Sequence, residues 1–312
     1  MIIERKEPWG ILQYDTKLHR FSYDDKGKGK DLPYAYAPIV LNVDLTMKCN
    51  MACKHCVAKD FGNMGDLFVD DNMVSLINKS PFMVIVITGG EPTLPEYEDN
   101  LITMLSKIKN KGLMIDTNGT IKPKASVMRI IKKTNTLIRV SWDSVRPQDE
   151  LYLRVGNPHE SKTNQQLYDT KIAMIKYYLS KGIDIAVQTV INRKNVVSVG
   201  KMPEVLSSLQ IKQWYLQRFI PSHQMADSDL GLSPEDYQKT VTSLGKKCAE
   251  LKIECIAKRD RRHNSVFLLV GDGKLYTQGE KPRQKICLGV MGNVTRFFDY
   301  VSSPDHSERY YG

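Results

Sequence analysis

Apolar runs of strand length alternate with longer segments of helical pattern through most of the chain. The apolar, β-rich runs predict strands at 39–46, 83–88, 113–117, 137–142, 183–191 and 213–220. The segments between them predict helices that include 98–111, 124–133, 163–181 and 201–209. Near-continuous apolar strands that alternate with helices are typical of a parallel sheet with helices on its faces. The pattern therefore predicts an α/β core, and periodicity alone leaves open a partial barrel or a doubly wound sheet.

Different patterns flank this core. Two alternating, aromatic-bearing runs at 9–15 and 19–24 predict an N-terminal β-hairpin, and a polar, Gly-rich linker follows at 26–33. After the core, Ser233 and Pro234 are a helix N-cap and first turn, and that helix is expected to end near Leu251. A strand at 252–258 and a hairpin around 271–273 come next. We expect an N-terminal hairpin and linker at 1–37, a core at 38–258 and a small C-terminal extension at 259–312.

Composition narrows the class of protein. The chain has 312 residues, of which 41% are hydrophobic and 26% charged, as is ordinary for a globular protein. Its aliphatic runs are too short to cross a membrane, and the start lacks the apolar region of a secretory signal. These features predict a cytoplasmic protein with no membrane partner. Six cysteines, half of them clustered, indicate metal or redox chemistry rather than disulfides.

The net charge of +10 is unevenly distributed. Lys and Arg exceed Asp and Glu most clearly between residues 246 and 285, around the basic stretch 258–263. Such a patch would attract nucleic acid, a nucleotide or an acidic peptide. A solvated basic face is the plainer alternative.

Three cysteines follow the first core strand at C-x3-C-x2-C spacing: Cys49, Cys53 and Cys56. Structural zinc sites usually take two ligand pairs from separate places, and here no second pair follows. With His55 as a fourth ligand, the cluster would be a zinc site of a non-catalytic protein. Thiolates are also the usual ligands of iron–sulfur clusters, and three of them leave one iron of a 4Fe–4S cluster open.

Distinctive polar residues follow the next three strands. Their stretches are Thr88-Gly-Gly-Glu-Pro92, Asp116-Thr-Asn-Gly-Thr120 and Ser141-Trp-Asp-Ser144. Each alone is compatible with an ordinary turn, since glycine, proline and Asn-Gly are common there. Ligands of parallel α/β folds bind at the carboxyl ends of strands, so the series indicates a single binding face.

Together, the cysteine spacing, the Gly-Gly-Glu-Pro stretch and Thr117-Asn-Gly119 resemble the radical S-adenosylmethionine (SAM) family over residues 38–220. The resemblance favours a partial (β/α)6 TIM-type barrel over a doubly wound sheet. It implies an enzyme with one 4Fe–4S cluster on Cys49, Cys53 and Cys56, and with SAM on the open iron. It further implies one-electron reduction by a donor such as flavodoxin or ferredoxin. Cleavage of SAM would then give a 5′-deoxyadenosyl radical that abstracts a hydrogen atom from the substrate.

The same resemblance assigns the residues that contact SAM. Gly89, Gly90, Glu91 and Pro92 would receive its amino group, and Arg154 would suit its carboxylate through bidentate geometry. The other positions implied as SAM contacts are Asn118, Ser141, Asp143, His55, Val190 and Gln217, of which Asp143 faces either SAM or the substrate. No residue is assigned to directing the substrate radical.

The substrate is less strongly implied than the chemistry. Residues 45–56 and 214–221 look most similar to the SPASM/twitch-related subgroup of peptide- and protein-modifying maturases, which predicts a peptide or protein side chain as substrate. That subgroup carries auxiliary clusters on a longer cysteine series, whereas Cys248, Cys255 and Cys287 are isolated here. We therefore expect these three to be structural and the chain to hold one cluster. A nucleotide or other phosphorylated small molecule, as in the viperin-like group, is the alternative substrate. A nucleic-acid-binding protein without catalysis is a further alternative from another class.

Overall fold

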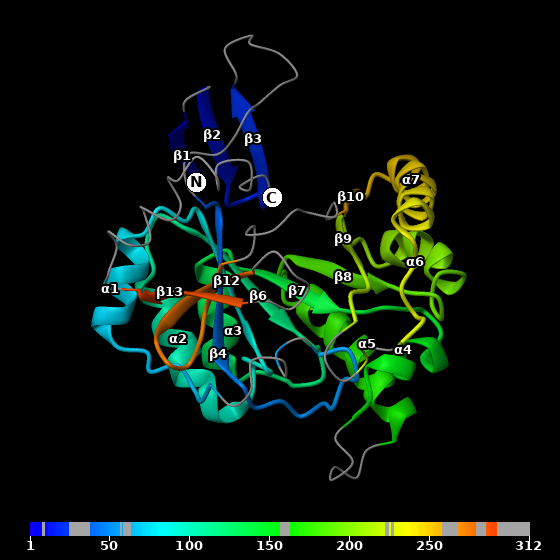
Figure 1. Ribbon diagram of the computed structural model, residues 1–312, viewed down its shortest axis with the longest axis horizontal. Helices are drawn as coiled ribbons and strands as arrows, with labels where there is room; N and C mark the ends of the chain where they lie inside the picture. Colours follow the sequence, from blue (N-terminus) through cyan, green and yellow to red (C-terminus); the bar gives the residue numbers. More distant parts are fainter. Residues whose placement is uncertain are drawn as a thin grey trace.

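The structure is a computed structural model, and it describes residues 1–7, 10–24, 38–56, 58, 64–156, 163–221, 225, 228–257, 267–278 and 285–291. Within these ranges the chain forms a curved, largely parallel sheet surrounded by helices (Figure 1). The predicted linker at 26–33 and the basic stretch 258–263 lie outside the described residues.

The main sheet has ten strands in the order β10-β9-β8-β7-β6-β5-β4-β11-β12-β13. From β4 to β9 every strand is parallel to the next one along the chain, which is the arrangement of a (β/α) barrel that remains open. The predicted partial barrel is confirmed. These strands are β4 (Val40–Thr46), β5 (Val84–Gly89), β6 (Gly112–Thr117), β7 (Leu137–Ser141), β8 (Ile185–Ile191) and β9 (Gln213–Arg218).

Helices cover the outer face of this sheet and bury the largest apolar cluster against it (Figure 1). The N-terminal ends carry the expected caps: Asp70 accepts a hydrogen bond from Met73 N, and Ser233 accepts one from Asp236 N. The helices are α1 (Asp71–Lys79), α2 (Glu98–Lys107), α3 (Ala125–Lys133), α4 (Pro147–Leu153), α5 (Asn164–Ser180), α6 (Met202–Ser208) and α7 (Pro234–Glu250). None of those described is both long enough and apolar enough to cross a membrane.

A separate three-stranded antiparallel sheet closes the amino end of the barrel. It consists of β1 (Ile2–Glu7), β2 (Gly10–Asp15) and β3 (Arg20–Asp24). The predicted hairpin is β2–β3, and β1 adds a strand that the sequence pattern did not reveal. Leu12 and Tyr14 of β2 pack on the first inward-facing apolar residues of the barrel strands, including Met83 and Leu137. The inner half of the barrel next to this sheet is therefore filled with side chains.

The C-terminal strands extend both edges of the main sheet. The strand β10 (Glu254–Ala257) is parallel to β9, and β11 (Phe267–Leu269) is parallel to β4. The predicted turn at 271–273 joins β11 to β12 (Lys274–Gln278), and β13 (Lys285–Val290) pairs with β12. Cys248 lies in α7 within the apolar core, Cys255 lies half-buried in β10, and Cys287 is exposed on β13. The boundary predicted at 258/259 stays a prediction.

Candidate active site

The cysteine loop follows β4 and is held by the end of α4. Ala52 N donates to Val155 O at 2.9 Å, and Lys54 N donates to Leu153 O at 2.8 Å. An isolated antiparallel bridge between Met51 and Gly156 extends this pairing. The half-buried thiols of Cys49, Cys53 and Cys56 therefore lie on a loop whose backbone is fixed to a neighbouring element.

The thiols of this loop have polar and charged neighbours that suit thiolate ligands. Cys49 Sγ accepts hydrogen bonds from Met51 N at 3.4 Å and from Asn118 Nδ2 at 3.8 Å. Burial raises the pKa of Cys49 to about 12 and also raises that of Cys53. For Cys53, the positive charges of Arg154 and Lys171 act in the opposite direction. Hydrogen bonds to sulfur and nearby charge are the means by which a protein tunes an iron–sulfur cluster.

Two glycines bring the loop after β5 against the cysteine loop. Gly90 N donates to Thr46 O at 2.6 Å, and Glu91 N donates to Lys48 O at 2.8 Å. A Cβ atom on Gly90 would lie 1.9 Å from Lys48 O, and Gly89 has a φ of +121°. Both positions therefore require glycine for this close backbone approach, before any ligand is considered.

Glu91 joins the loops that follow β5 and β6. Its fully buried carboxylate accepts hydrogen bonds from Thr93 N at 3.1 Å and Thr93 Oγ1 at 2.5 Å. It also accepts from Thr117 Oγ1 at 2.8 Å and from Asn118 N at 2.7 Å. Burial raises the pKa of Glu91, and these donors oppose the rise. Its described contacts are thus with the protein's own loops.

Asn118 joins the loop after β6 to the cysteine loop. Its Oδ1 accepts from Thr120 N at 2.9 Å and Thr120 Oγ1 at 2.6 Å, while its Nδ2 donates to Asn50 Oδ1 at 2.9 Å. Asn50 Nδ2 in turn donates to Thr120 Oγ1 at 2.8 Å. This closed set of bonds fixes the side chain that also reaches Cys49.

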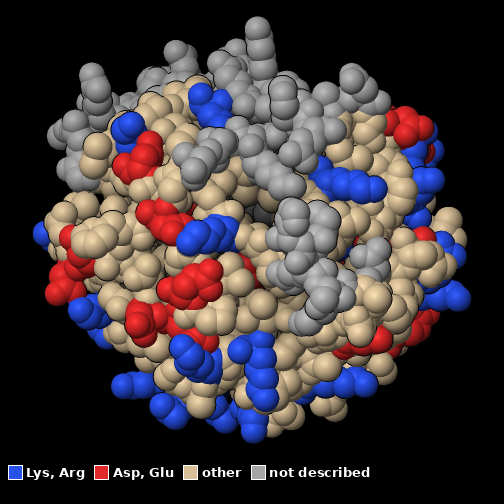
Figure 2. All heavy atoms as spheres, turned by 90° about the horizontal axis from the view of Figure 1, so that it is seen from below, with Lys and Arg blue, Asp and Glu red and all other residues tan. Residues whose placement is uncertain are grey.

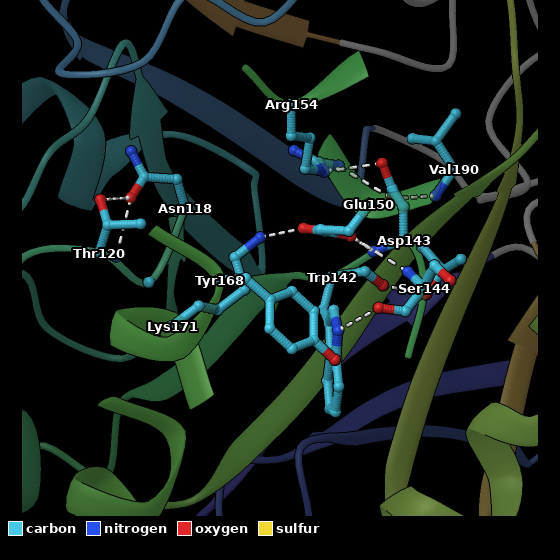
Figure 3. A network of polar contacts seen from close by, with 12 residues as sticks. Asn118, Thr120, Trp142, Asp143, Ser144, Glu150, Arg154, Tyr168, Lys171 and Val190 are labelled. Atoms are coloured by element: carbon cyan, nitrogen blue, oxygen red, sulfur yellow. Dashed lines mark hydrogen bonds and ion pairs between the residues drawn. The ribbon is translucent and has the colours of Figure 1, made fainter. Parts of the chain in front are cut away.

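A buried network of charged residues lies beside the loops that follow β7 and β8 (Figure 3). Arg154 forms a bidentate pair with Asp143, with Nε–Oδ2 at 2.7 Å and Nη2–Oδ1 at 3.1 Å. Asp143 Oδ1 also accepts from Val190 N at 2.8 Å. Glu150 pairs with Lys171 and accepts from the backbone of Asp143 at 2.5 Å. All four charged side chains are at most 8% exposed, so each charge depends on its partner.

The ion pair sets the protonation state of this network. Burial by itself would raise the pKa of Asp143, but the Arg154 guanidinium holds it below its usual range. Sequence reasoning assigned Arg154 and Asp143 each to a bound ligand, whereas in the structure the two side chains bind each other.

The remaining predicted contacts lie at the same end of the barrel. Ser141 ends β7, while Val190 and Gln217 lie late in β8 and β9, and all three are half-buried. His55 makes a backbone hydrogen bond with Leu153, and burial together with Arg154 lowers its pKa to about 4. Its buried Nδ1 has no hydrogen-bond partner among the described residues.

Sequence reasoning missed Asn50, Thr120, Glu150 and Lys171. The sequence does offer a signal for Asn50, because it lies between Cys49 and Cys53. In the structure its side chain accepts a hydrogen bond from Asn118. Glu150 and Lys171 have none, because Glu and Lys side chains are ordinarily exposed, and only Lys171 lies on a predicted helix.

The loop presents three thiols, the ligand type of an iron–sulfur cluster, in which each cysteine binds a different iron. Among the described residues, no group of three or more His, Cys, Asp or Glu side chains is placed to hold a single metal ion. The hydrogen bonds to Cys49 Sγ and the orphaned His55 Nδ1 are further features that a bound cluster and cofactor would use.

Comparison with known proteins gives one matching family model. The model of the radical SAM superfamily matches residues 43–195, a range that includes the three cysteines and every strand-end loop described above except the one after β9.

Curated relatives match over parts of their length. A 7-carboxy-7-deazaguanine synthase of Bacteroides thetaiotaomicron is 36% identical over 23% of this chain and 37% of its own. An AdoMet-dependent heme synthase of Nitratidesulfovibrio vulgaris is 22% identical over 64% of this chain and 53% of its own. A GTP 3′,8-cyclase of Staphylococcus aureus is 27% identical over 49% of this chain and 46% of its own. The chain thus spans about half or less of these three relatives.

Solved structures share the fold across most of the chain. Streptococcus suis SuiB bound to S-adenosylmethionine has a TM-score of 0.64 at 12% identity, covering 88% of this chain and 80% of SuiB. The protein anSMEcpe with bound AdoMet also has a TM-score of 0.64, at 14% identity, covering 88% of this chain and 83% of its own. Each of the two was also solved with a peptide: SuiB with the precursor peptide SuiA, and anSMEcpe with the peptide Cp18Cys.

Proposed function

This chain is an enzyme of the radical SAM superfamily, and from that premise we propose that Cys49, Cys53 and Cys56 hold its single 4Fe–4S cluster. When bound, the cluster and SAM supply a 5′-deoxyadenosyl radical, formed with methionine by one-electron reductive cleavage of SAM. The observation that carries this assignment is the joining of the cysteine loop to the loops after β5 and β6 by Gly90, Glu91 and Asn118.

The residues around the cysteine loop bind and orient SAM in this proposal. The backbone of Gly89–Pro92 faces the amino group, while Glu91 holds that backbone and the Asn118 loop in place. Arg154 uses Nε and Nη2 for Asp143 and offers the rest of its guanidinium to the SAM carboxylate. The neutral His55 ring, Ser141, Val190 and Gln217 line the adenosine. The apolar side chains between the N-terminal sheet and the barrel strands, among them Leu12, Tyr14 and Met83, exclude water from the amino end of the barrel.

We propose a peptide or protein side chain as the substrate. Support comes from the fold shared with SuiB and anSMEcpe, both of which were solved with bound peptides. A flavodoxin- or ferredoxin-type donor supplies the electron. A C–H bond of that side chain would supply the hydrogen atom that turns the radical into 5′-deoxyadenosine.

A nucleotide substrate is the second candidate. It is favoured by the similarity to GTP 3′,8-cyclase over 49% of the chain. The basic stretch 258–263 that would attract a phosphorylated substrate or nucleic acid lies outside the described residues, so its role stays a prediction.

Anaerobic reconstitution tests the proposal. The chain should bind about four irons and, with dithionite and SAM, release 5′-deoxyadenosine that mass spectrometry detects. Cys53→Ala should lose both properties. Cys287→Ala, which changes an exposed cysteine on β13, is the matched control and should keep both. Colourless protein with stoichiometric zinc, or an intact cluster without SAM cleavage, would contradict the assignment.

A further inference from the structure

An exposed tyrosine with two lysines over its ring lies beside the cysteine loop. The Nζ atom of Lys54 is 5.0 Å from the centre of the Tyr152 ring, and the Nζ atom of Lys194 is 5.2 Å from it. Tyr152 is 38% exposed on α4, and both lysines are exposed. The cysteine loop, α4 and the segment after β8 thus meet at one ring. We call these three residues the lysine–tyrosine patch.

A backbone hydrogen bond attaches the lysine–tyrosine patch to the cysteine loop. Lys54 directly follows Cys53, and its N–H donates to the carbonyl oxygen of Leu153 at 2.8 Å. Leu153 is the residue after Tyr152, so the ring and the loop are held together by the main chain of both segments. The lysine–tyrosine patch is therefore surface that lies next to a proposed ligand of the iron–sulfur cluster.

Tyr152 belongs to the solvent-facing side of α4. Leu151 and Leu153 on either side of it are at most 8% exposed, and Glu150 is fully buried. Gln148, one helical turn before Tyr152 and on the same face, is exposed. The short helix thus turns one side to the buried charged network and presents Tyr152 on the other.

The acidic residues of this region do not neutralise the lysine–tyrosine patch. All three acids between the end of β7 and the end of α4 are already in ion pairs: Asp143 with Arg154, Asp149 with Arg146, and Glu150 with Lys171. Within the described part of the chain, Lys194 forms no ion pair, and its Nζ atom contacts the Tyr152 ring instead. Two cations beside an exposed aromatic ring suit a partner with acidic groups on its surface.

A second ring with two lysines shows that this arrangement alone is not specific. Lys122 and Lys181 lie with their Nζ atoms 4.8 and 5.6 Å from the centre of the Tyr177 ring. Contacts between a cation and an aromatic ring recur in proteins. No residue of this second site belongs to the cysteine loop, so the position of the lysine–tyrosine patch is what distinguishes it.

Charge at the cysteine-loop end of the molecule is local rather than uniform. Figure 2 shows the molecule from below the view of Figure 1, the end toward which the loop after β4 runs. Lys and Arg side chains lie there among Asp and Glu side chains. The net charge of +10 would attract an acidic protein from a distance, and particular residues would then have to fix where it binds.

We propose that the lysine–tyrosine patch is the docking surface of the electron donor, an acidic protein of the flavodoxin or ferredoxin type. Electron transfer slows steeply as the distance between two redox centres grows, so the donor has to bind close to the cysteine loop. The donor is oxidised by one electron and the iron–sulfur cluster is reduced by one, and no proton or leaving group has to move. This inference rests on the proposed function and gives its electron donor a place on the surface.

Anaerobic stopped-flow spectroscopy on the full, reconstituted chain tests this docking surface. Reduced flavodoxin is the probe, and dithionite is the small donor that needs no docking. Lys54→Gln with Lys194→Gln should slow reduction by flavodoxin about tenfold at low salt, and added salt should slow this variant less than the wild type. Glutamine keeps the backbone N–H that holds the cysteine loop. SAM cleavage driven by dithionite should therefore be the same in the variant and the wild type.

Two further variants separate the lysine–tyrosine patch from charge in general. Lys194→Gln alone lies outside the cysteine loop and should slow reduction by flavodoxin about threefold. Lys122→Gln with Lys181→Gln removes the same charge beside Tyr177 and should leave the flavodoxin rate near that of the wild type. Equal low-salt rates for the wild type and the variant of Lys54 and Lys194 would overturn the proposal. An equally large loss in the variant of Lys122 and Lys181 would overturn it too.

Other acidic partners are tested with the same variants. Binding of an oligoglutamate peptide and of a single-stranded oligonucleotide is measured by fluorescence anisotropy. Loss of either in the variant of Lys54 and Lys194, with an unchanged flavodoxin rate, would assign the lysine–tyrosine patch to that partner and overturn the proposal. Absence of dithionite-driven SAM cleavage by the wild type would count against the proposed function. Normal cleavage with a flavodoxin rate insensitive to both lysines would count against the docking surface alone.

Discussion

The buried Glu91 carboxylate accepts hydrogen bonds from Thr93, Thr117 and Asn118, so it connects two strand-end loops before any ligand binds. In Glu91→Gln, one oxygen becomes an NH2 group that faces a backbone N–H donor. We expect the free energy of unfolding to fall by about 1–3 kcal/mol, the usual cost of an unsatisfied buried group. Urea unfolding measures it, with the exposed Glu96→Gln as control. Equal stability of wild type and Glu91→Gln would contradict this role.

Asp44 should make stability depend on pH. Its pKa is raised from 3.8 to about 7 in the folded chain, so between these values the unfolded chain has lost a proton that the folded chain keeps. Folding therefore loses stability as pH rises through this window, by about 4 kcal/mol in total. Lys285 and Asp116 are the charges that act on Asp44 in this range.

Asp44→Asn removes this dependence. Between pH 5 and pH 8 the unfolding free energy of the variant should change less than that of the wild type. The variant should therefore gain most stability relative to the wild type at pH 8. Asp71→Asn is the control, because that carboxylate is 82% exposed and pairs only at the surface. If Asp44→Asn and the wild type respond equally to pH, Asp44 is not protonated in the folded chain at neutral pH.

At the scale of single residues, sequence reasoning found site residues but not their partners. The cysteine spacing and the strand ends pointed to Glu91, Asn118 and Asp143, and the family resemblance added Arg154. The structure places all four at one end of the barrel. The pairing of Arg154 with Asp143 could not be predicted, because periodicity tells which face a residue occupies and not which side chain it meets. Gln188 also lies on a predicted strand, but nothing local marks it as a side chain whose buried oxygen has no hydrogen-bond partner among the described residues.

Among the elements, the short helix α4 contributes most to the site. It carries Glu150 and leads directly into Arg154, and the segment after it pairs with the cysteine loop. Its seven residues are too few for a helical period to be recognised, and α1 was likewise not predicted. The long helices and the core strands were predicted to within a few residues, because each buries a continuous apolar face.

A double-mutant cycle tests the link between α4 and α5. Lys171→Met leaves the buried Glu150 charge unpaired and should cost about 3–5 kcal/mol of unfolding free energy. Glu150→Gln with Lys171→Met removes both charges and should recover at least about 1 kcal/mol of that loss. Urea unfolding of the wild type, both single variants and the double variant gives the coupling. Strictly additive effects would show that the two helices are not joined by this pair.

At the scale of the whole molecule, the barrel is closed at one end by the N-terminal sheet. Residues of β2 fill the amino end, and Asn135 Nδ2 and Gln213 Nε2 donate to backbone carbonyls of the β2–β3 turn. The sequence predicted a hairpin there and a barrel after it, but it did not predict that the N-terminal sheet packs into the amino end of the barrel. Contacts between segments more than a hundred residues apart leave no local pattern. The choice between a barrel and a doubly wound sheet likewise came from the family resemblance and not from periodicity.

Tyr14 is the residue through which this closure is best tested. Its ring is fully buried and packs on Gly112, where an added Cβ would lie 2.2 Å from the ring. Tyr14→Ala should lower the unfolding free energy by about 3–5 kcal/mol, as for other large aromatic truncations, whereas Leu18→Ala, at a side chain that is 59% exposed, should change little. Gly112→Ala should be destabilising alone and nearly neutral in the Tyr14→Ala background, because the methyl group then enters the space that the ring has left. If Gly112→Ala is equally costly in both backgrounds, the Tyr14 ring does not occupy the amino end of the barrel.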